Sequence, residues 1–177
     1  MFKTWLATQV MNSQKFKKIL LNLSIILFIF FIDRFSKIYI LEIVETNGNV
    51  DIYINSFLNI VLYWNTGIGF GLFSFEQSQT YNFITLIIII VNLIIIYLIY
   101  KSTNFKIYFY IIILGGSLGN LYDRVYYNAV PDFIDLHINN FHWFIFNIAD
   151  IFISLGVICL IYVEIFFKDK LKNEQKN

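Results

Sequence analysis

The sequence of 177 residues has little of what marks most protein classes. It contains one cysteine and one proline, and 14% of its residues are charged, whereas a soluble domain has roughly 25%. The single cysteine excludes a disulfide scaffold. The low charge, together with 58% hydrophobic residues, excludes an ordinary cytosolic domain and a disordered chain. A net charge of +1 gives no indication of a nucleic-acid partner.

What the sequence does contain is long apolar runs. A helix needs about 20 mostly apolar residues to cross the hydrocarbon core, and four stretches are suitable: residues 19–41, 82–100, 107–125 and 150–167. The apolar part of the first is too long for a typical signal peptide, and no small-residue cleavage site follows it. We therefore predict an all-α membrane protein with four transmembrane helices.

The basic residues predict the orientation of these helices. Ten of the thirteen Lys and Arg residues lie before residue 19, at residues 101–106 or after residue 167. Since cytoplasmic segments carry the excess of Lys and Arg, both termini are expected in the cytoplasm. We expect residues 1–18 to be a basic cytoplasmic extension, 19–167 the membrane domain and 168–177 a charged cytoplasmic tail.

The first outer connection predicts a small structure of its own. Val50–Asn55 alternates apolar and polar residues, which is typical of a half-buried strand, and Asn47 and Gly48 supply a turn before it. We expect a small sheet on the outer surface between the first two spans. The alternative is a loop that rests on lipid headgroups.

Polar side chains within or next to the spans mark the candidate site, because charge in hydrocarbon is costly and usually functional. With a rise of about 1.5 Å per residue, they are predicted to gather near the outer end of the helices. They are Asp33, Lys37, Asn120, Asp123, Arg124, Asp132 and Asp150. Three simpler interpretations remain open: a self-neutralising Asp33–Lys37 pair, an Asp123–Arg124 ion pair, and a helix-capping role for Asp150.

The remaining reactive side chains receive structural interpretations. We expect Asp135 to be solvated and His137 and His142 to face solvent or the interface, since two histidines without a spaced acid make a poor zinc site. Cys159 is expected to pack within the last span. The segment 115–119 fits the GxSxG pattern around Ser117, but in an apolar helix its glycines favour close helix packing instead.

A pair of aspartates, Asp132 and Asp150, is then left to carry chemistry. Two close carboxylates in a poorly solvated site tend to share one proton. The ionised carboxylate can accept a proton from water while the neutral one donates to a substrate carbonyl. This is aspartyl-protease chemistry, although ion or proton transport would use similar residues.

Five motifs, in order along the chain, resemble those of bacterial lipoprotein signal peptidase (signal peptidase II) over roughly residues 20–167. The motifs are Asp33-Arg-Phe-Ser-Lys37, Asn65-Thr-Gly-Ile-Gly-Phe-Gly71, Gly115-Gly-Ser-Leu-Gly-Asn-Leu-Tyr-Asp-Arg124, Val130-Pro-Asp-Phe133 and Phe146-Asn-Ile-Ala-Asp150. Two positions depart from the pattern: Pro131 is more often aliphatic, and Gly69 is more often alanine. Pro131 has a fixed φ and could adjust how Asp132 is presented.

The resemblance implies an intramembrane aspartyl endopeptidase of the bacterial plasma (inner) membrane, with its active site near the extracytoplasmic face. Members cut prolipoproteins just before a cysteine that carries diacylglycerol, without a cofactor or metal. By motif, Asp132 and Asp150 are the catalytic dyad. The side chains that orient substrate and contact the antibiotic globomycin are Asn65, Asn120, Arg124 and Asn147.

The resemblance also implies that Asp33 and Lys37 support the site, and that an outer β-cradle accompanies the helices. The expected partners are lipid-modified prolipoproteins, membrane lipid and globomycin-type inhibitors, and a monomer is expected because the site needs one chain. Two rival functions are a rhomboid-like serine protease using Ser117 with His137 or His142, and a proton-coupled carrier dependent on Asp33 and Asp150.

Overall fold

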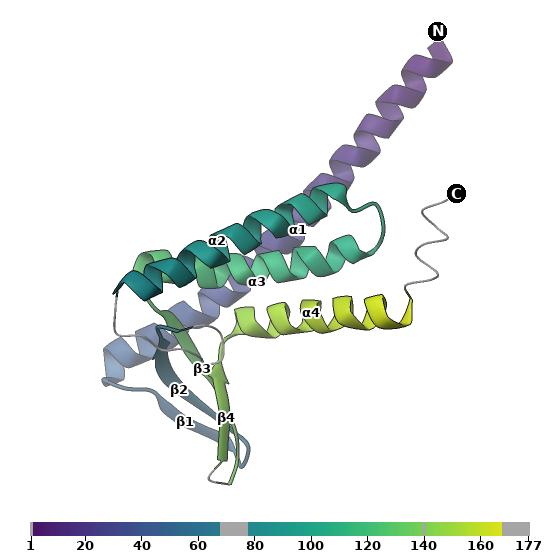
Figure 1. The fold of residues 1–177 in the computed structure, drawn as a ribbon. Helices are drawn as coiled ribbons and strands as arrows, with labels where there is room; N and C mark the ends of the chain where they lie inside the picture. The colour runs from purple at the N-terminus through teal and green to yellow at the C-terminus, as the bar shows by residue number, and fades with distance from the viewer. Residues whose placement is uncertain (1, 68–77, 140, 168–177) are drawn as a thin grey trace.

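The computed structural model describes residues 2–67, 78–139 and 141–167. Helices and a small sheet alternate along this part of the chain (Figure 1). The elements are α1 (Phe2–Asn47), β1 (Asp51–Asn55), β2 (Leu58–Asn65), α2 (Ser78–Lys101), α3 (Lys106–Tyr127), β3 (Val130–Ile138), β4 (Phe141–Phe146) and α4 (Ile148–Phe166). Each of the four predicted spans thus coincides with a helix.

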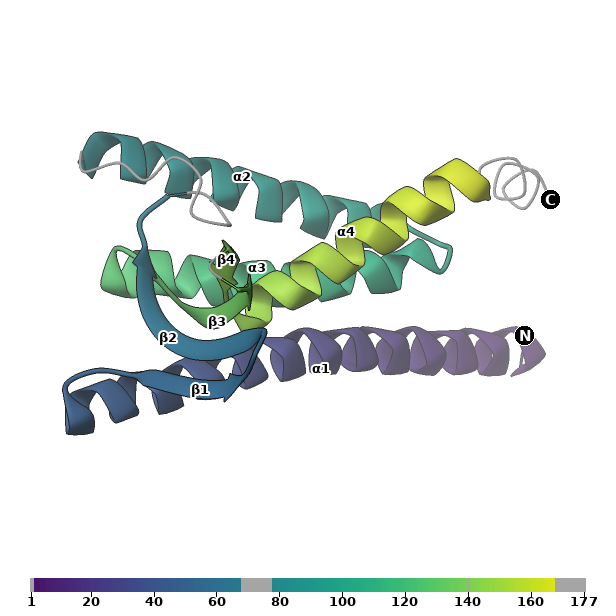
Figure 2. The same cartoon turned by 90° about the horizontal axis from the view of Figure 1, so that it is seen from below.

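Three of the helices in the described ranges are long and apolar enough to cross a membrane: Ser13–Asn47 of α1, Tyr81–Lys101 of α2 and Ile148–Phe166 of α4. The protein is therefore membrane-integral. The helix α3 is not among them, because glycines and polar residues fill its second half. It is the central helix instead, and it packs against α1, α2 and α4 (Figure 2).

The first helix is longer than the predicted span. The helix α1 begins at Phe2 and continues without interruption to Asn47, so the residues before 19 belong to the same helix as the span. Its membrane part carries large exposed apolar side chains such as Leu27, Phe28 and Phe31. Exposed apolar side chains along a helix are typical of a lipid-facing surface.

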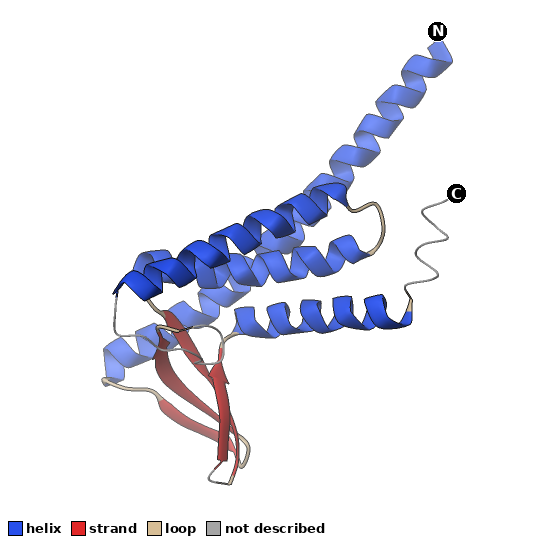
Figure 3. Ribbon diagram, viewed as in Figure 1, coloured by secondary structure: helices blue, strands red, loops and turns tan. Residues whose placement is uncertain are grey.

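The sheet is larger than predicted, because it takes strands from two connections. Its four strands are antiparallel in the order β1-β2-β3-β4, and it extends from one end of the helices (Figure 3). The strand predicted at Val50–Asn55 is confirmed as β1, although its side chains are mostly exposed rather than half-buried. The segment after α3, where no strand was predicted, forms β3, which is buried over its first four residues.

A small apolar cluster joins the sheet to the helices. Ile40 of α1 packs with Val50 and with Phe133 of β3, and Ile148 at the start of α4 contacts the same cluster. Burying such side chains contributes about 1.5–3 kcal/mol each. The cluster therefore fixes β3 and the first turn of α4 against α1, and these are the elements that carry Asp132 and Asp150.

Two glycines of α3 allow it to approach α1 closely. A Cβ atom added at Gly115 would lie 2.9 Å from the Cβ atom of Ile29, and one at Gly119 would lie 2.5 Å from Oδ2 of Asp33. Gly116 has the same role toward α4, where an added Cβ would lie 2.6 Å from the carbonyl oxygen of Ala149. The prediction that these glycines serve helix packing is confirmed.

Candidate active site

Asp132 lies on β3, where the strand passes beside the helix ends. Its side chain is 1% exposed, and β3 pairs with β2 so that Asp132 is opposite Tyr63. Two amides donate to the Asp132 carboxylate: Nδ2 of Asn65 to Oδ2 at 2.9 Å and Nδ2 of Asn147 to Oδ1 at 2.6 Å. Both oxygens therefore have a donor although the group is withdrawn from water.

Asp150 lies in the first turn of α4, within a capping box. Oδ1 of Asn147, the N-cap residue, accepts from the backbone N–H of Asp150 at 3.1 Å, and Oδ2 of Asp150 accepts from the backbone N–H of Asn147 at 3.2 Å. The capping interpretation of Asp150 is confirmed. The cap leaves Oδ1 of Asp150 to accept from Nδ2 of Asn120 at 2.8 Å.

The two carboxylates line one cavity of about 260 Å³. Its polar wall also includes three asparagines, one arginine and two serines, whereas its apolar wall is formed by Ile88, Val130 and Ile153. The other polar lining residues are Asn65, Ser117, Asn120, Arg124, Asn147 and Ser154. Asp132 thus shares this cavity with Asp150 and with the four residues predicted to orient substrate: Asn65, Asn120, Arg124 and Asn147.

Burial and charge set the protonation of Asp132. Its withdrawal from water and the nearby Asp150 carboxylate raise the pKa of Asp132 from 3.8 to about 7, against the amides of Asn65 and Asn147, which lower it. Two carboxylates that disfavour each other's ionisation hold one proton between them over the intervening pH range. The pair is therefore suited to hold one carboxylic acid and one carboxylate near neutral pH.

Arg124 reaches the other side of the cavity, toward the end of β2. Its guanidinium donates to the carbonyl oxygen of Gly67 and lies 5.4 Å from the ring centre of Tyr81. Asn65 also holds this segment, because its Oδ1 accepts from the backbone N–H of Gly67 at 2.9 Å. The next residues, 68–77, lie outside the described ranges, and so does the unusual Gly69.

A layer of buried charges lies between α1 and α3, next to the cavity. Nζ of Lys37, which is 0% exposed, donates to Oδ2 of Asp33 at 2.8 Å, to Oδ1 of Asn120 at 2.8 Å and to Oδ2 of Asp123 at 2.7 Å. Arg34 pairs with the other oxygen of Asp123. The Asp33–Lys37 pair is therefore real but belongs to a larger network that joins the two helices.

Two details of this layer differ from the sequence interpretation. The Asp123–Arg124 ion pair, one of the interpretations left open, is not formed among the described residues, because Asp123 faces α1 while Arg124 faces Gly67. Arg34 was missed, and the signal available was a second basic residue beside Asp33 in an apolar span.

Asp33 links this layer to the first turn of α4, which carries Asp150. Its Oδ1 accepts from the backbone N–H of Ala149 at 2.9 Å. Ala149 precedes Asp150 in the first turn of α4, whose amides have no partner within the helix. Asp33 thus fixes the turn that presents Asp150, while Asn120 contacts both Lys37 and Asp150.

The connection between α3 and α4 also differs from expectation. Asp135, predicted to be solvated, is 2% exposed, and His137 is largely buried, whereas His142 is 57% exposed on its side chain as predicted. Asp135 and both histidines belong to the β3–β4 hairpin and do not line the dyad cavity. Cys159 is partly buried in α4.

Ser117 lines the cavity but lacks the surroundings of a serine nucleophile. Among the described residues, no hydrogen bond joins Ser117 to His137 or His142, and His142 is bonded to Asp135 instead. A serine nucleophile needs a base within hydrogen-bond reach. The geometry therefore favours the aspartate pair.

Comparisons with known proteins agree with this geometry. The family model described as signal peptidase (SPase) II matches residues 25–166. A lipoprotein signal peptidase from Pelagibacter ubique is 53% identical over 93% of this chain and 99% of its own length, and one from Thermodesulfovibrio yellowstonii is 38% identical over 77% and 89%. A solved bacterial membrane enzyme superposes with a TM-score of 0.67 at 30% identity, over 84% of this chain and 88% of its own.

Proposed function

The chain belongs to the signal peptidase II family and is an aspartic-type peptidase that removes signal peptides from prolipoproteins, and from this premise we propose that Asp132 and Asp150 are its catalytic dyad. The observation that carries the proposal is that both carboxyl groups line one cavity and accept hydrogen bonds from asparagine amides. Membership of this family argues against the two rival functions, a proton-coupled carrier and a rhomboid-like serine protease.

In the proposed reaction the dyad works as one acid and one base. The ionised carboxylate accepts a proton from a water molecule, whose oxygen attacks the scissile carbonyl carbon, while the protonated carboxylate donates to the carbonyl oxygen. Collapse of the tetrahedral intermediate breaks the C–N bond. The leaving amine takes the proton that came from water, and the former carbonyl oxygen returns its proton to the dyad as the C=O bond re-forms, which restores the starting state. The raised pKa of Asp132 supports this sharing of one proton at neutral pH.

The asparagines and Arg124 are proposed to position the dyad and the substrate. Asn65 and Asn120 each donate to one carboxylate. Asn147 donates to Asp132 through its side-chain amide and to Asp150 through its backbone N–H. The guanidinium of Arg124, a rigid fork of donors, lines the same cavity and suits a peptide carbonyl of the substrate. Its bond to the Gly67 carbonyl supports this role, since it already binds such a group.

Asp33 and Lys37 are proposed to support the site without contacting substrate. Lys37 fixes Asn120, and Asp33 fixes the backbone of Ala149. Each therefore acts on Asp150 through one intermediate contact.

An apolar groove beside the dyad supports a lipid-modified substrate, cut just before a diacylglyceryl cysteine. The groove has a volume of about 310 Å³ and is formed mainly by Phe146, Ile151, Leu155 and Ile158. It also includes Asp150, so an acyl chain in the groove would lie next to the catalytic cavity. Globomycin-type inhibitors are proposed to occupy the same cavity, and a monomer suffices because one chain supplies the whole site.

The proposed placement has four transmembrane helices in the bacterial inner membrane, with both termini in the cytoplasm and the dyad near the extracytoplasmic face. The fourth span is α3. Residues 1–18 would be a basic cytoplasmic extension of α1, residues 19–167 the peptidase domain and 168–177 a cytoplasmic tail. The distribution of Lys and Arg supports this orientation.

The decisive experiment is cleavage of a diacylglyceryl-modified precursor by the purified protein, with and without globomycin. Asp132→Asn and Asp150→Asn should each abolish cleavage while the protein still inserts into the membrane. Asp51→Asn, which changes an exposed carboxylate on β1 of the same sheet, is the matched control and should remain active. Cleavage by either aspartate variant would overturn the assignment. Loss of cleavage in Ser117→Ala, with both aspartate variants active, would favour the serine mechanism instead.

A further inference from the structure

Three side chains with metal-ligand atoms meet on the β3–β4 hairpin, away from the catalytic cavity. Asp135 and His137 are two residues apart on β3, so they share one face of the strand, and His142 on β4 is opposite His137 in the register. One ligand atom from each of the three lies within 4.8 Å of the others. The pairing of the two strands therefore builds this cluster, which no short sequence motif marks.

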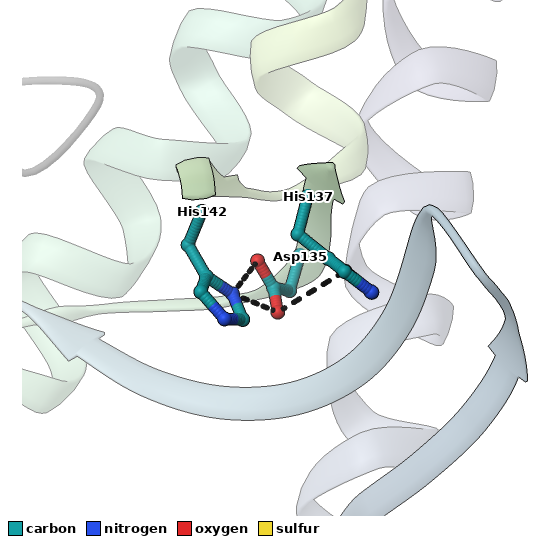
Figure 4. A group of neighbouring side chains, drawn as sticks. All are labelled: Asp135, His137 and His142. Atoms are coloured by element: carbon teal, nitrogen blue, oxygen red, sulfur yellow. Dashed lines mark hydrogen bonds and ion pairs between the residues drawn. The ribbon is translucent and has the colours of Figure 1, made fainter. Parts of the chain in front are cut away.

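The Asp135 carboxylate lies between the two imidazoles (Figure 4). Nδ1 of His142 is 2.8 Å from Oδ2 of Asp135 and 3.0 Å from Oδ1, and Nδ1 of His137 is 3.8 Å from Oδ2. The two rings stack with their centres 5.1 Å apart and their planes at 26°. All three ligand atoms thus point into one small volume.

Burial leaves one polar atom of this cluster unsatisfied. Nδ1 of His137 is buried and has no hydrogen-bond partner among the residues that the structure describes. A buried polar atom without a partner costs about 1–3 kcal/mol, and such an atom requires an explanation. It is directed at the Asp135 carboxylate, which is itself almost fully buried. A cation between them would satisfy both groups.

We propose that Asp135, His137 and His142 bind a divalent metal ion of the zinc class. Imidazole nitrogen and carboxylate oxygen are ligands that Zn²⁺ accepts in tetrahedral geometry at about 2.0–2.2 Å, which separates two ligand atoms by about 3.3 Å. The observed separations of 2.8 Å and 3.8 Å lie on either side of this value. The exposed His142 provides the entry path, and water completes the coordination.

The ion would be structural, because none of its three ligands lines the dyad cavity. It would join β3 to β4 through the opposed His137 and His142, and it would neutralise Asp135. This reverses the expectation that the histidines have no ligand role. That expectation rested on the absence of an acidic ligand near the two histidines, and the buried Asp135 is such a ligand.

The test uses the full chain, purified in detergent without a polyhistidine tag and stripped of metal with a chelator. Zn²⁺ binding is measured by isothermal titration calorimetry, and Co²⁺ is used as a spectroscopic probe of the ligand geometry. His137→Ala, His142→Ala and Asp135→Asn are compared with two controls, Asp51→Asn on β1 and Cys159→Ala on α4, which remove other potential ligands.

We expect one Zn²⁺ per chain, tetrahedral Co²⁺ absorption, and a melting temperature that rises when Zn²⁺ is added. Each of the three ligand variants should weaken binding by about tenfold or more and lose the Zn²⁺-dependent rise in melting temperature, whereas both controls should keep them. Circular dichroism identifies any variant that fails to fold. If His142→Ala fails to fold, the milder His142→Gln replaces it. Stoichiometric binding that survives in all three variants, or no binding by the native chain, would overturn the proposal.

Discussion

At the scale of single residues, the Asn147 side chain contacts both aspartates of the proposed dyad. Its amide donates to Asp132, while its oxygen accepts from the backbone N–H of Asp150 and so caps α4. One side chain therefore sets the charge of one aspartate and the position of the other. The two roles use different atoms, and substitutions can separate them.

Asn147→Ala should lose both roles. Losing the cap should lower the free energy of unfolding by about 1 kcal/mol. Losing the hydrogen bond from its amide to the Asp132 carboxyl group, worth about 0.5–1.5 kcal/mol, should reduce kcat by about 2-fold to 10-fold. Asn147→Ser keeps a cap oxygen but has no amide, so it should recover stability without activity. Thermal unfolding and precursor cleavage measure the two effects, and recovery of activity in Asn147→Ser would contradict the division.

The raised pKa of Asp132 predicts a pH limit on activity. As the pH rises through about 7, Asp132 loses the proton that the mechanism requires, and both carboxylates become ionised. We expect kcat to fall on the alkaline side by about tenfold per pH unit above about 7. Cleavage of the lipid-modified precursor between pH 5.5 and 9 provides the measurement, with thermal unfolding at each pH to exclude denaturation. A rate that stays constant to pH 9 would contradict the pKa assignment.

At the scale of elements, the charged layer fixes α1 against α3. Lys37 contacts two carboxylates and one amide while fully buried, and Arg34 balances the remaining charge. Gly119 allows the helices to come this close. A buried ion network of this kind is costly to break on one side only, because the remaining charges lose their partners.

Lys37→Met should therefore destabilise the protein by about 3–5 kcal/mol. The double change Lys37→Met with Asp33→Asn restores the charge balance and should recover part of the loss. Lys106→Met is the control, since Lys106 pairs with the exposed Glu164 and such a pair contributes about 0–1 kcal/mol. Unfolding in detergent followed by circular dichroism gives the three values. Equal losses for Lys37→Met and Lys106→Met would show that the layer has no special role.

The helices could be predicted from the sequence, but half of the sheet could not. Apolar runs determine each helix locally, and the rise per residue then brought Asp33, Asn120 and Asp150 to one level. The strand β3 depends on pairing with β2, a contact between distant parts of the chain that local patterns do not report. The strand β4 pairs in turn with β3. For the same reason the burial of Asp135 was missed, while β1, with its alternating pattern, was found.

At the scale of the whole molecule, the dyad lies where the helices meet the sheet. The proposed orientation makes this the extracytoplasmic end, and two exposed positions test it. On a Cys159→Ala background, Tyr53→Cys in β1 should react with a membrane-impermeant maleimide added to intact spheroplasts. Thr103→Cys, in the connection between α2 and α3, should react only after the membrane is permeabilised. The reverse pattern would place the dyad at the cytoplasmic face.

The pairing of β2 with β3 also determines when the enzyme can become active during its synthesis. Asn65 is opposite Val130 in this pairing, so β2 cannot pair with the strand that carries Asp132 until α2 and α3 have left the ribosome. Asn147 and Asp150 follow later still. A nascent chain therefore has no assembled pair of carboxylates during insertion, and proteolytic competence arises only once the last helix is in place.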